Sequence, residues 1–300
     1  PSPKILIEAM GEVKPHLICI VPLILEKIYR KQIKPSLEKG VVKLAMRVPL
    51  LDTQVYASVC NRLTESFGGE FTQVIAGGAP LNSEVEEFLH KIKFRFTVGY
   101  GLTECAPLIS YTYYKDFIPT SCGRVLDGLM EAKIDSPDPQ RIPGEICVRG
   151  EHVMKGYYKN PEATRQVIDE EGWLHTGDIG TMNEDNTLFI KGRSKSMILS
   201  ANGQNIYPEE IESKLNNMSC VLESLVVERD GKLVALVYPD YEQADEAGIS
   251  YSDIQRVMDE NKEVLNTLVA PYEQVTKIML WPNEFEKTPK KSIKRFLYNR

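Results

Sequence analysis

The sequence predicts an α/β fold followed by a separate, small α+β domain. A strand, a turn, a helix and a second strand succeed one another between residues 72 and 98, an order typical of a parallel sheet. Short strands without a long helix between them occupy residues 123–191 and indicate a small barrel or an antiparallel sheet. After residue 193 the order becomes β-α-β-β-α-β. We therefore expect two domains, residues 1–192 and residues 193–300.

The composition is that of an ordinary globular protein and argues against some partners. The 300 residues suffice for two domains with a substantial core, and 42% of them are hydrophobic and 26% charged. The net charge of -6 argues against nucleic-acid binding, which needs positive charge near the phosphates. Six cysteines without a CxxC pair and four histidines without metal-ligand spacing predict reduced thiols, no zinc and a cytoplasmic location. Small molecules are the favoured partners.

The first 67 residues predict neither a signal peptide nor a membrane span. The longest apolar run, Leu17–Leu25, contains Pro22 and is shorter than the ~20 residues that a bilayer requires. Because the chain begins at Pro1, we interpret it as a processed product or an excised fragment. The elements expected here are a buried strand, a helix and a helical region broken at Pro49, namely His16–Val21, Pro22–Ile33 and Leu44–Phe67.

The next segment predicts a βαβ unit. A strand, Thr72–Ala76, runs into the turn Gly77–Pro80, and a helix then begins at Ser83, with Glu86 completing a capping box. The apolar face of this helix and the strand that follows it consist of Val85, Phe88, Leu89, Ile92, Phe94, Phe96 and Val98. Gly77-Gly78 and Gly99-Tyr100-Gly101 then end neighbouring parallel strands at one carboxyl edge, where open α/β sheets bind ligands.

The region after Arg193 predicts a compact α+β unit. Pro208 suits the first position of a helix, Glu228–Gly231 suits a hairpin turn, and Ser250 suits the cap of the last helix. The expected elements are the strand Ser196–Ser200, the helix Pro208–Asn217, the strands Val221–Val227 and Lys232–Tyr238, the capped helix and a strand that ends near Trp281.

Two charged residues flank a predicted hairpin at the joint between the two regions. Asp178 is expected at the start of a strand, and Arg193 follows the strand Thr187–Lys191 after the polar turn Asn183–Asn186. A carboxylate and a guanidinium in this position could bind the hydroxyls of a sugar, or they could pair with each other. The chemistry alone favours the ion pair.

The segment Tyr100–Glu104 combines an aromatic ring, a glycine, a hydroxyl and a carboxylate. These groups suit stacking on a base and holding a phosphate with its Mg²⁺. The alternative, of equal weight, is a turn in which Thr103 caps the next segment and Glu104 is solvated. Gly77–Pro80 is a weaker signal, because a glycine pair after a strand is usually a turn, and no P-loop motif occurs.

Other polar residues carry less weight. Lys290, Lys291, Lys294 and Arg295 could contact a polyphosphate, but such runs are more often solvated. Ser292 has no adjacent histidine, and His175 has no nucleophile beside it, so neither predicts a catalytic pair.

Several motifs together resemble the adenylate-forming superfamily, and most closely its long-chain fatty acid:CoA ligases. One such motif would be weak, but this many in the expected order are specific, and they cover nearly the whole chain. The motifs are VPLILEKIY from Val21, GGAPL from Gly77, YGLTE from Tyr100, GEICVRG from Gly144, GYYKNPEAT from Gly156, GWLHTGDIG from Gly172 and GRSKSMILSANGQNIYPEEIE from Gly192.

The resemblance implies a role for each matching residue. Residues 1–192 would be the carboxyl-terminal part of a large adenylation domain, and residues 193–300 a small mobile domain. The implied assignments are adenine stacking for Tyr100, the adenine and acyl-adenylate pocket for Gly77, Gly78 and Ala79, cofactor binding for Gly101, the α-phosphate for Thr103, Mg²⁺ for Glu104, the ribose for Asp178 and Arg193, the domain hinge for Lys195 and the pantetheine tunnel for Gly203.

The implied reaction has two steps. A fatty acid carboxylate attacks the α-phosphate of Mg·ATP to form acyl-AMP and pyrophosphate, and the thiol of CoA then displaces AMP. Catalysis is expected from positioning and from neutralisation of phosphoryl charge rather than from a side-chain nucleophile. The implied partners are a fatty acid, ATP, CoA and Mg²⁺, and the full-length protein is expected to allow peripheral contact with the inner face of a membrane.

Two departures from the family pattern qualify this expectation. The phosphate loop that belongs upstream of residue 1 is absent, so we interpret the chain as a fragment and do not expect it to form acyl-AMP alone. In the tail, Ser292 occupies the place of the catalytic lysine, so either Lys291 or Lys290 replaces its charge or the first half-reaction is slow. Our hypothesis is the replacement. Alternative functions are the loading of a carrier protein and a non-catalytic acyl- or nucleotide-binding role.

Overall fold

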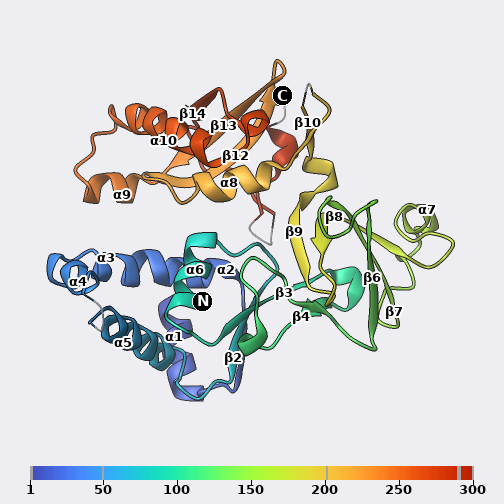
Figure 1. Ribbon diagram of the computed structural model, residues 1–300, viewed down its shortest axis with the longest axis horizontal. Helices are drawn as coiled ribbons and strands as arrows, with labels where there is room; N and C mark the ends of the chain where they lie inside the picture. The colour runs from blue at the N-terminus through green and yellow to red at the C-terminus, as the bar shows by residue number, and fades with distance from the viewer. Residues whose placement is uncertain (1–2, 49–50, 201, 289–291, 299–300) are drawn as a thin grey trace. The chain divides into compact units, whose positions relative to one another are not determined.

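The computed structural model describes residues 3–48, 51–200, 202–288 and 292–298 (Figure 1). The chain divides into two compact units, which are described separately below. The first unit comprises residues 1–133, 147–176 and 182–189, and the second comprises residues 134–146, 177–181 and 190–300.

A five-stranded mixed sheet organises the first unit (Figure 1). Its spatial order is the chain order, β1-β2-β3-β4-β5, with β1, β2 and β3 parallel and the later pairs antiparallel. The strands are β1 (Leu17–Ile20), β2 (Gln73–Gly77), β3 (Phe96–Gly101), β4 (Leu108–Tyr111) and β5 (Arg124–Val125). The predicted βαβ unit is therefore confirmed, and an antiparallel extension follows it.

Helices pack against this sheet around an aromatic core. Phe67, Phe71 and Phe94 form a cluster with ring centroids 5.6 to 6.2 Å apart, and Leu25 and Leu89 are also buried. The predicted helix Pro22–Ile33 is an α-helix that continues as a π-helical turn, Tyr29–Ile33. The helices are α1 (Pro3–Val13), α2 (Pro22–Ile28), α3 (Lys34–Leu37), α4 (Gly40–Ala45), α5 (Leu51–Ser66) and α6 (Ser83–Lys91).

The cap of α6 differs from the prediction. Asn82, not Ser83, is the N-cap, because Asn82 keeps an extended backbone and its side chain accepts a hydrogen bond from the Val85 N–H at 3.3 Å. Glu86 instead accepts a hydrogen bond from the Thr120 N–H. The capping box was therefore wrong, although the start of the helix was right.

The middle of the chain forms a four-stranded sheet of order β6-β7-β8-β9, with the short helix α7 (Pro161–Arg165) between β7 and β8. The adjacency of β8 and β9 confirms the hairpin, but Asp178 lies inside β8 rather than at its start. The strand begins earlier because Leu174 forms a bridge with Ile168, and the His175 N–H donates to the Val167 carbonyl. The strands are β6 (Met130–Asp135), β7 (Gly144–Gly150), β8 (Leu174–Met182) and β9 (Leu188–Arg193).

The second unit contains a three-stranded sheet, β12-β13-β14, against which α8 and α10 pack (Figure 1). The predicted first strand does not join this sheet. It is shorter and pairs with β11, because two hydrogen bonds between Ser200 and Gln204 turn the chain back on itself. The elements are β10 (Ile198–Leu199), β11 (Asn205–Ile206), α8 (Pro208–Leu215), β12 (Val221–Arg229), β13 (Lys232–Pro239), α9 (Tyr241–Glu246), α10 (Ile254–Leu268) and β14 (Lys277–Leu280).

The predicted cap of α10 was also wrong. The residue before the helix is Asp253, and no side chain caps it. The Ser250 hydroxyl instead donates to the Asp253 carboxylate at 2.5 Å, which stabilises the preceding turn. A hydroxyl three residues before Asp253 satisfies the Asp253 side chain rather than an N–H of the first turn.

Candidate nucleotide site

The two glycine-bearing strand ends of the first unit lie side by side. Gly77 of β2 is opposite Gly99 of β3 in the parallel register, so the carboxyl-edge prediction is confirmed. Gly78 and Ala79, which follow β2, are exposed. Gly101 is required by the chain itself, because a Cβ at this position would lie 1.9 Å from the Pro107 carbonyl oxygen.

The residues after β3 form a short 3₁₀ turn, Thr103–Cys105. Tyr100 is buried on β3, Thr103 is exposed, and Glu104 is half-buried. The Glu104 carboxylate accepts a hydrogen bond from the Tyr157 hydroxyl at 2.9 Å, and the Glu104 carbonyl accepts one from the Met154 N–H at 2.7 Å. The residue before this turn is Leu102 and no side chain caps it, so Thr103 does not have the capping role of the alternative, while the half-buried Glu104 keeps part of its surface in solvent.

Asp178 and Arg193, both in the second unit, form an ion pair. The Arg193 Nε atom lies 3.0 Å from the Asp178 Oδ1 atom, and the exposed fractions of the side chains are 63% for Arg193 and 5% for Asp178. The exposed guanidinium keeps donors at the surface while it neutralises the buried carboxylate. The ion pair that the chemistry favoured is therefore present, and it also places a donor and an acceptor together.

The residues that follow Arg193 line a cavity of about 290 Å³ in the second unit. Lys195 lies in the 3₁₀ turn Ser194–Ser196 and lines this cavity together with Arg295. Gly203 is exposed in the turn between β10 and β11.

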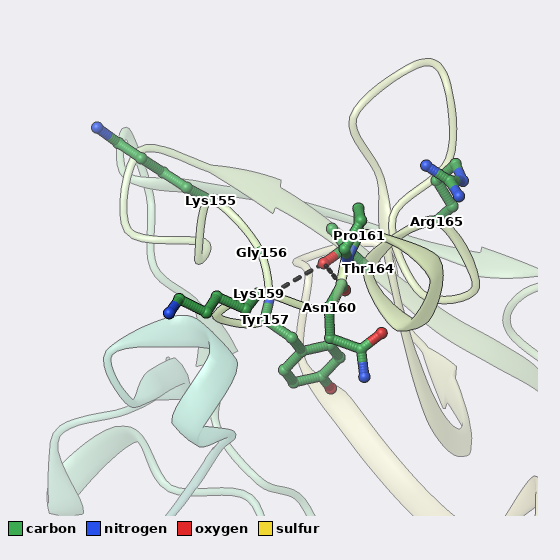
Figure 2. Close-up of a pocket in the computed structure, with 8 residues that line it drawn as sticks. All are labelled: Lys155, Gly156, Tyr157, Lys159, Asn160, Pro161, Thr164 and Arg165. Carbon is green, nitrogen blue, oxygen red and sulfur yellow. Dashed lines mark hydrogen bonds between the residues drawn. The ribbon is translucent and has the colours of Figure 1, made fainter.

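Eight residues between Lys155 and Arg165 line a pocket of about 440 Å³ in the first unit (Figure 2). Three cations lie at this pocket, but the side chains of Lys155, Lys159 and Arg165 point away from one another. The polar atoms that do converge belong to Tyr157, Asn160 and Thr164.

A comparison with known families shows to which family the chain belongs. The sequence profile described as "AMP-binding enzyme" matches residues 1–158, which is more than half of the chain. The chain belongs to the AMP-binding enzyme family.

Individual relatives of this chain differ in the acid that their names specify. A 4-coumarate–CoA ligase 5 from Oryza sativa subsp. japonica is 41% identical over 51% of this chain and 30% of its own length. A long-chain-fatty-acid–CoA ligase 5 from Rattus norvegicus is 30% identical over 94% of this chain and 46% of its own length. The chain thus spans about half the length, or less, of the curated relatives that it matches.

Solved structures show the same fold. The O-succinylbenzoate coenzyme A synthetase MenE from Bacillus subtilis, in complex with AMP, aligns with a TM-score of 0.72 at 21% identity. The alignment covers 100% of this chain and 54% of that chain. None of the helices in the described residues combines the length and the apolar composition that a membrane span requires.

The described cations of the carboxyl-terminal tail are engaged within the second unit. Lys287 pairs with Glu223, and Lys294 pairs with Glu286 at 3.3 Å. Ser292 is exposed, and its carbonyl accepts a hydrogen bond from the Thr288 N–H at 2.8 Å. Lys290 and Lys291, the proposed substitutes for the lysine that Ser292 replaces, lie outside the described residues.

Arg295 also forms its contacts inside the unit. Its Nη1 atom lies 2.8 Å from both carboxylate oxygens of Glu212, and its Nη2 atom donates to the Val226 carbonyl at 2.9 Å. Together with the other tail contacts, this argues against a polyphosphate site made by Lys294 and Arg295.

The sequence analysis missed a contact of His175. The His175 Nδ1 atom lies 3.6 Å from the Cys147 Sγ atom, and its Nε2 atom lies 3.6 Å from an Asp169 carboxylate oxygen. Cys147 is fully buried, so its thiol has no access to a substrate and the contact is structural. Cys147 is 28 residues from His175 in sequence and lies on the neighbouring strand, so inspection of the residues next to His175 in the sequence could not reveal this contact.

We expect Glu212 to make the stability of this chain fall as the pH rises. Burial raises the pKa of the Glu212 carboxyl to about 7, although Arg295 opposes the rise. The folded chain therefore holds this proton in a window, between about pH 4.5 and pH 7, where the unfolded chain has released it. The free energy of unfolding should decrease by about 1 to 3 kcal/mol across this window.

Urea denaturation at about pH 5 and about pH 7.5 checks this, with Glu212→Gln as the comparison. The glutamine variant lacks the titrating group, so its stability should change less between the two pH values. An equal change in both proteins would contradict the assignment to Glu212.

Proposed function

We propose that the protein containing this chain is an ATP-dependent ligase that activates a long-chain fatty acid as acyl-AMP and transfers the acyl group to CoA. The observation that carries the proposal is the carboxyl edge of the parallel strands, where the Gly77-Gly78 end of β2 lies beside the Gly99–Glu104 segment. Ligands of open α/β sheets bind at such an edge, and membership of the AMP-binding family is in accord with a nucleotide there.

The residues at this edge suit the chemistry of a metal–nucleotide substrate. The Glu104 carboxylate and the Thr103 hydroxyl are hard oxygen donors, the class that Mg²⁺ prefers. In this proposal Glu104 holds the cation and Thr103 contacts the α-phosphate. A bound Mg²⁺ would supply neutralisation of the charge that develops on the phosphoryl oxygens.

The remaining assignments belong to the same proposal. Asp178 accepts hydrogen bonds from the ribose hydroxyls while Arg193 donates to them. The pair already holds one acceptor and one donor together, which is what a diol requires. The other proposed roles are adenine stacking by Tyr100, the nucleotide pocket for Gly77, Gly78, Ala79 and Gly101, a hinge at Lys195 between domains 1–192 and 193–300, the pantetheine path at Gly203, and charge supplied by Lys291.

The relatives offer a direct alternative to the fatty acid as the substrate, namely 4-coumarate. The rat long-chain-fatty-acid ligase aligns over 94% of this chain at 30% identity, and a 4-coumarate:CoA ligase 1 from Petunia hybrida aligns over 85% at 33% identity. We favour the fatty acid because the sequence motifs resemble the long-chain fatty acid:CoA ligases most closely and because the rat alignment extends over more of the chain.

Acid-dependent exchange between ATP and labelled pyrophosphate in the full-length protein tests the proposal. Palmitate should stimulate exchange more than 4-coumarate or malonate, and CoA rather than an acyl carrier protein should accept the acyl group. Stimulation by 4-coumarate alone would overturn the fatty acid assignment, and the absence of exchange with every acid would overturn the adenylating activity.

Replacing Asp178 with asparagine should raise the KM for ATP by about tenfold or more, because a hydrogen bond to a charged group contributes about 1.5 to 3 kcal/mol. Asp185→Asn is the matched control. Asp185 is an ion-paired aspartate between β8 and β9, 3.3 Å from Arg124, and it has no proposed contact with ATP. An equal effect of the two changes would contradict the ribose assignment.

A further inference from the structure

The segment that follows β7 contacts the proposed metal ligand twice, and the assignments above give it no role. The Met154 N–H donates to the Glu104 carbonyl, and the Tyr157 hydroxyl donates to the Glu104 Oε1 atom at 2.9 Å. One contact fixes the backbone of Glu104 and the other fixes its carboxylate. Tyr157 and Glu104 are 53 positions apart in sequence, so only the path of the chain brings them together.

Tyr157 is itself held by a local hydrogen-bond network (Figure 2). Its N–H donates to the Thr164 hydroxyl at 2.9 Å, and this hydroxyl donates to the Asn160 carbonyl at 3.0 Å. Gly156 allows the close approach, because a Cβ there would lie 2.9 Å from two atoms of the Thr164 side chain. The backbone that carries the Tyr157 ring is thus anchored to α7 rather than left as an open loop.

The hydroxyl of Tyr157 is the donor in this hydrogen bond, because an ionised carboxylate offers only acceptor atoms. A carboxylate offers about four lone-pair sites. A single hydrogen bond to Oε1 therefore fixes the orientation of the group while other sites stay available to a cation.

We propose that Tyr157 is a positioning residue that holds the Glu104 carboxylate in the orientation needed to bind Mg²⁺. This inference rests on the proposed function, in which Glu104 holds the cation. Tyr157 acts through Glu104 and not on the substrate. The loop between β7 and α7 then supports the metal ligand.

Tyr157→Phe in the full-length protein tests the inference, because it removes one hydroxyl and keeps the ring. The probe is Mn²⁺ in the presence of a non-hydrolysable ATP analogue, with free Mn²⁺ measured by electron paramagnetic resonance. We expect the Kd for Mn²⁺ to rise by about tenfold, the effect of losing a charge-assisted hydrogen bond. In steady-state assays the KM for Mg²⁺ should rise while the KM for the acid stays unchanged.

The matched control is Tyr158→Phe at the next position. The Tyr158 side chain is 88% exposed, so loss of its hydroxyl should leave the Kd for Mn²⁺ within about twofold of the unmodified protein. Equal effects of the two variants would overturn the proposal. If Tyr157→Phe unfolds, Thr164→Val is the second variant, and it should weaken Mn²⁺ binding by releasing the Tyr157 backbone.

Glu104→Gln separates this inference from the proposed function. A double variant that combines Glu104→Gln with Tyr157→Phe should bind Mn²⁺ no more weakly than Glu104→Gln alone, since the Tyr157 hydroxyl acts only through the Glu104 carboxylate. If Glu104→Gln weakens Mn²⁺ binding and Tyr157→Phe does not, the positioning role is wrong and the metal assignment stands. If Glu104→Gln itself leaves Mn²⁺ binding unchanged, the metal role of Glu104 is wrong, and the inference falls with it.

Discussion

Replacing Arg295 with alanine is expected to lower the free energy of unfolding of the second unit by about 3 to 5 kcal/mol, because it leaves a buried charge without its partner. The Arg295 guanidinium bonds both oxygens of the Glu212 carboxylate at 2.8 Å, and the exposed fractions of the two side chains are 19% and 11%. It also lies 4.0 Å from Glu209, whose second carboxylate oxygen is buried without a hydrogen-bond partner. Both carboxylates would lose their only nearby cation among the contacts of the described residues.

Urea denaturation at about pH 8, where Glu212 is charged, measures this effect. The chain has two tryptophans, Trp173 in the first unit and Trp281 in the second, so a Trp173→Phe background makes fluorescence report the second unit. Lys294→Ala is the matched control at the adjacent position. Its partner, Glu286, has a side chain that is 66% exposed, and such pairs contribute about 0 to 1 kcal/mol. Similar losses for the two variants would contradict the buried-pair argument.

Gly101→Ala should destabilise the first unit by about 3 kcal/mol and abolish acid-dependent exchange in the full-length protein, since overpacking against rigid backbone is costly. The added Cβ would lie 1.9 Å from the Pro107 carbonyl oxygen and 2.8 Å from its carbonyl carbon. The carbonyl cannot move away without loss of its 2.7 Å hydrogen bond from the Leu102 N–H. A shift of the backbone at Gly101 and Leu102 would move the residues that follow them, Thr103 and Glu104.

Gly99→Ala provides the comparison within the same strand. A Cβ at Gly99 would meet side-chain atoms of Ile75 and Leu108 at 3.4 Å, which is an ordinary contact, so we expect a cost of about 1 kcal/mol or less. Chemical denaturation and the exchange assay should therefore distinguish the two glycines. If Gly101→Ala were as mild as Gly99→Ala, the close approach to Pro107 would not constrain this turn.

Periodic burial made much of the fold predictable. The face formed by Val85, Phe88, Leu89 and Ile92 is buried as its spacing predicted, and β12 and β13 lie within two residues of their expected ends. Boundaries that depend on competing hydrogen bonds were less predictable. Asn82 and Ser83 are both good caps, and the choice between them depends on backbone conformation, which the residue types do not decide.

The alternation of apolar residues and the placement of turn residues were enough to determine the βαβ unit, the β8–β9 hairpin and the meeting of the Gly77 and Gly99 strand ends, because these features depend on neighbours in sequence. Only the tertiary structure decided which side chains support the candidate site. Tyr157 reaches Glu104 across 53 residues, and Arg295 reaches Glu212 across 83. Such contacts follow from the path of the folded chain, and no local pattern encodes the distance between groups so far apart.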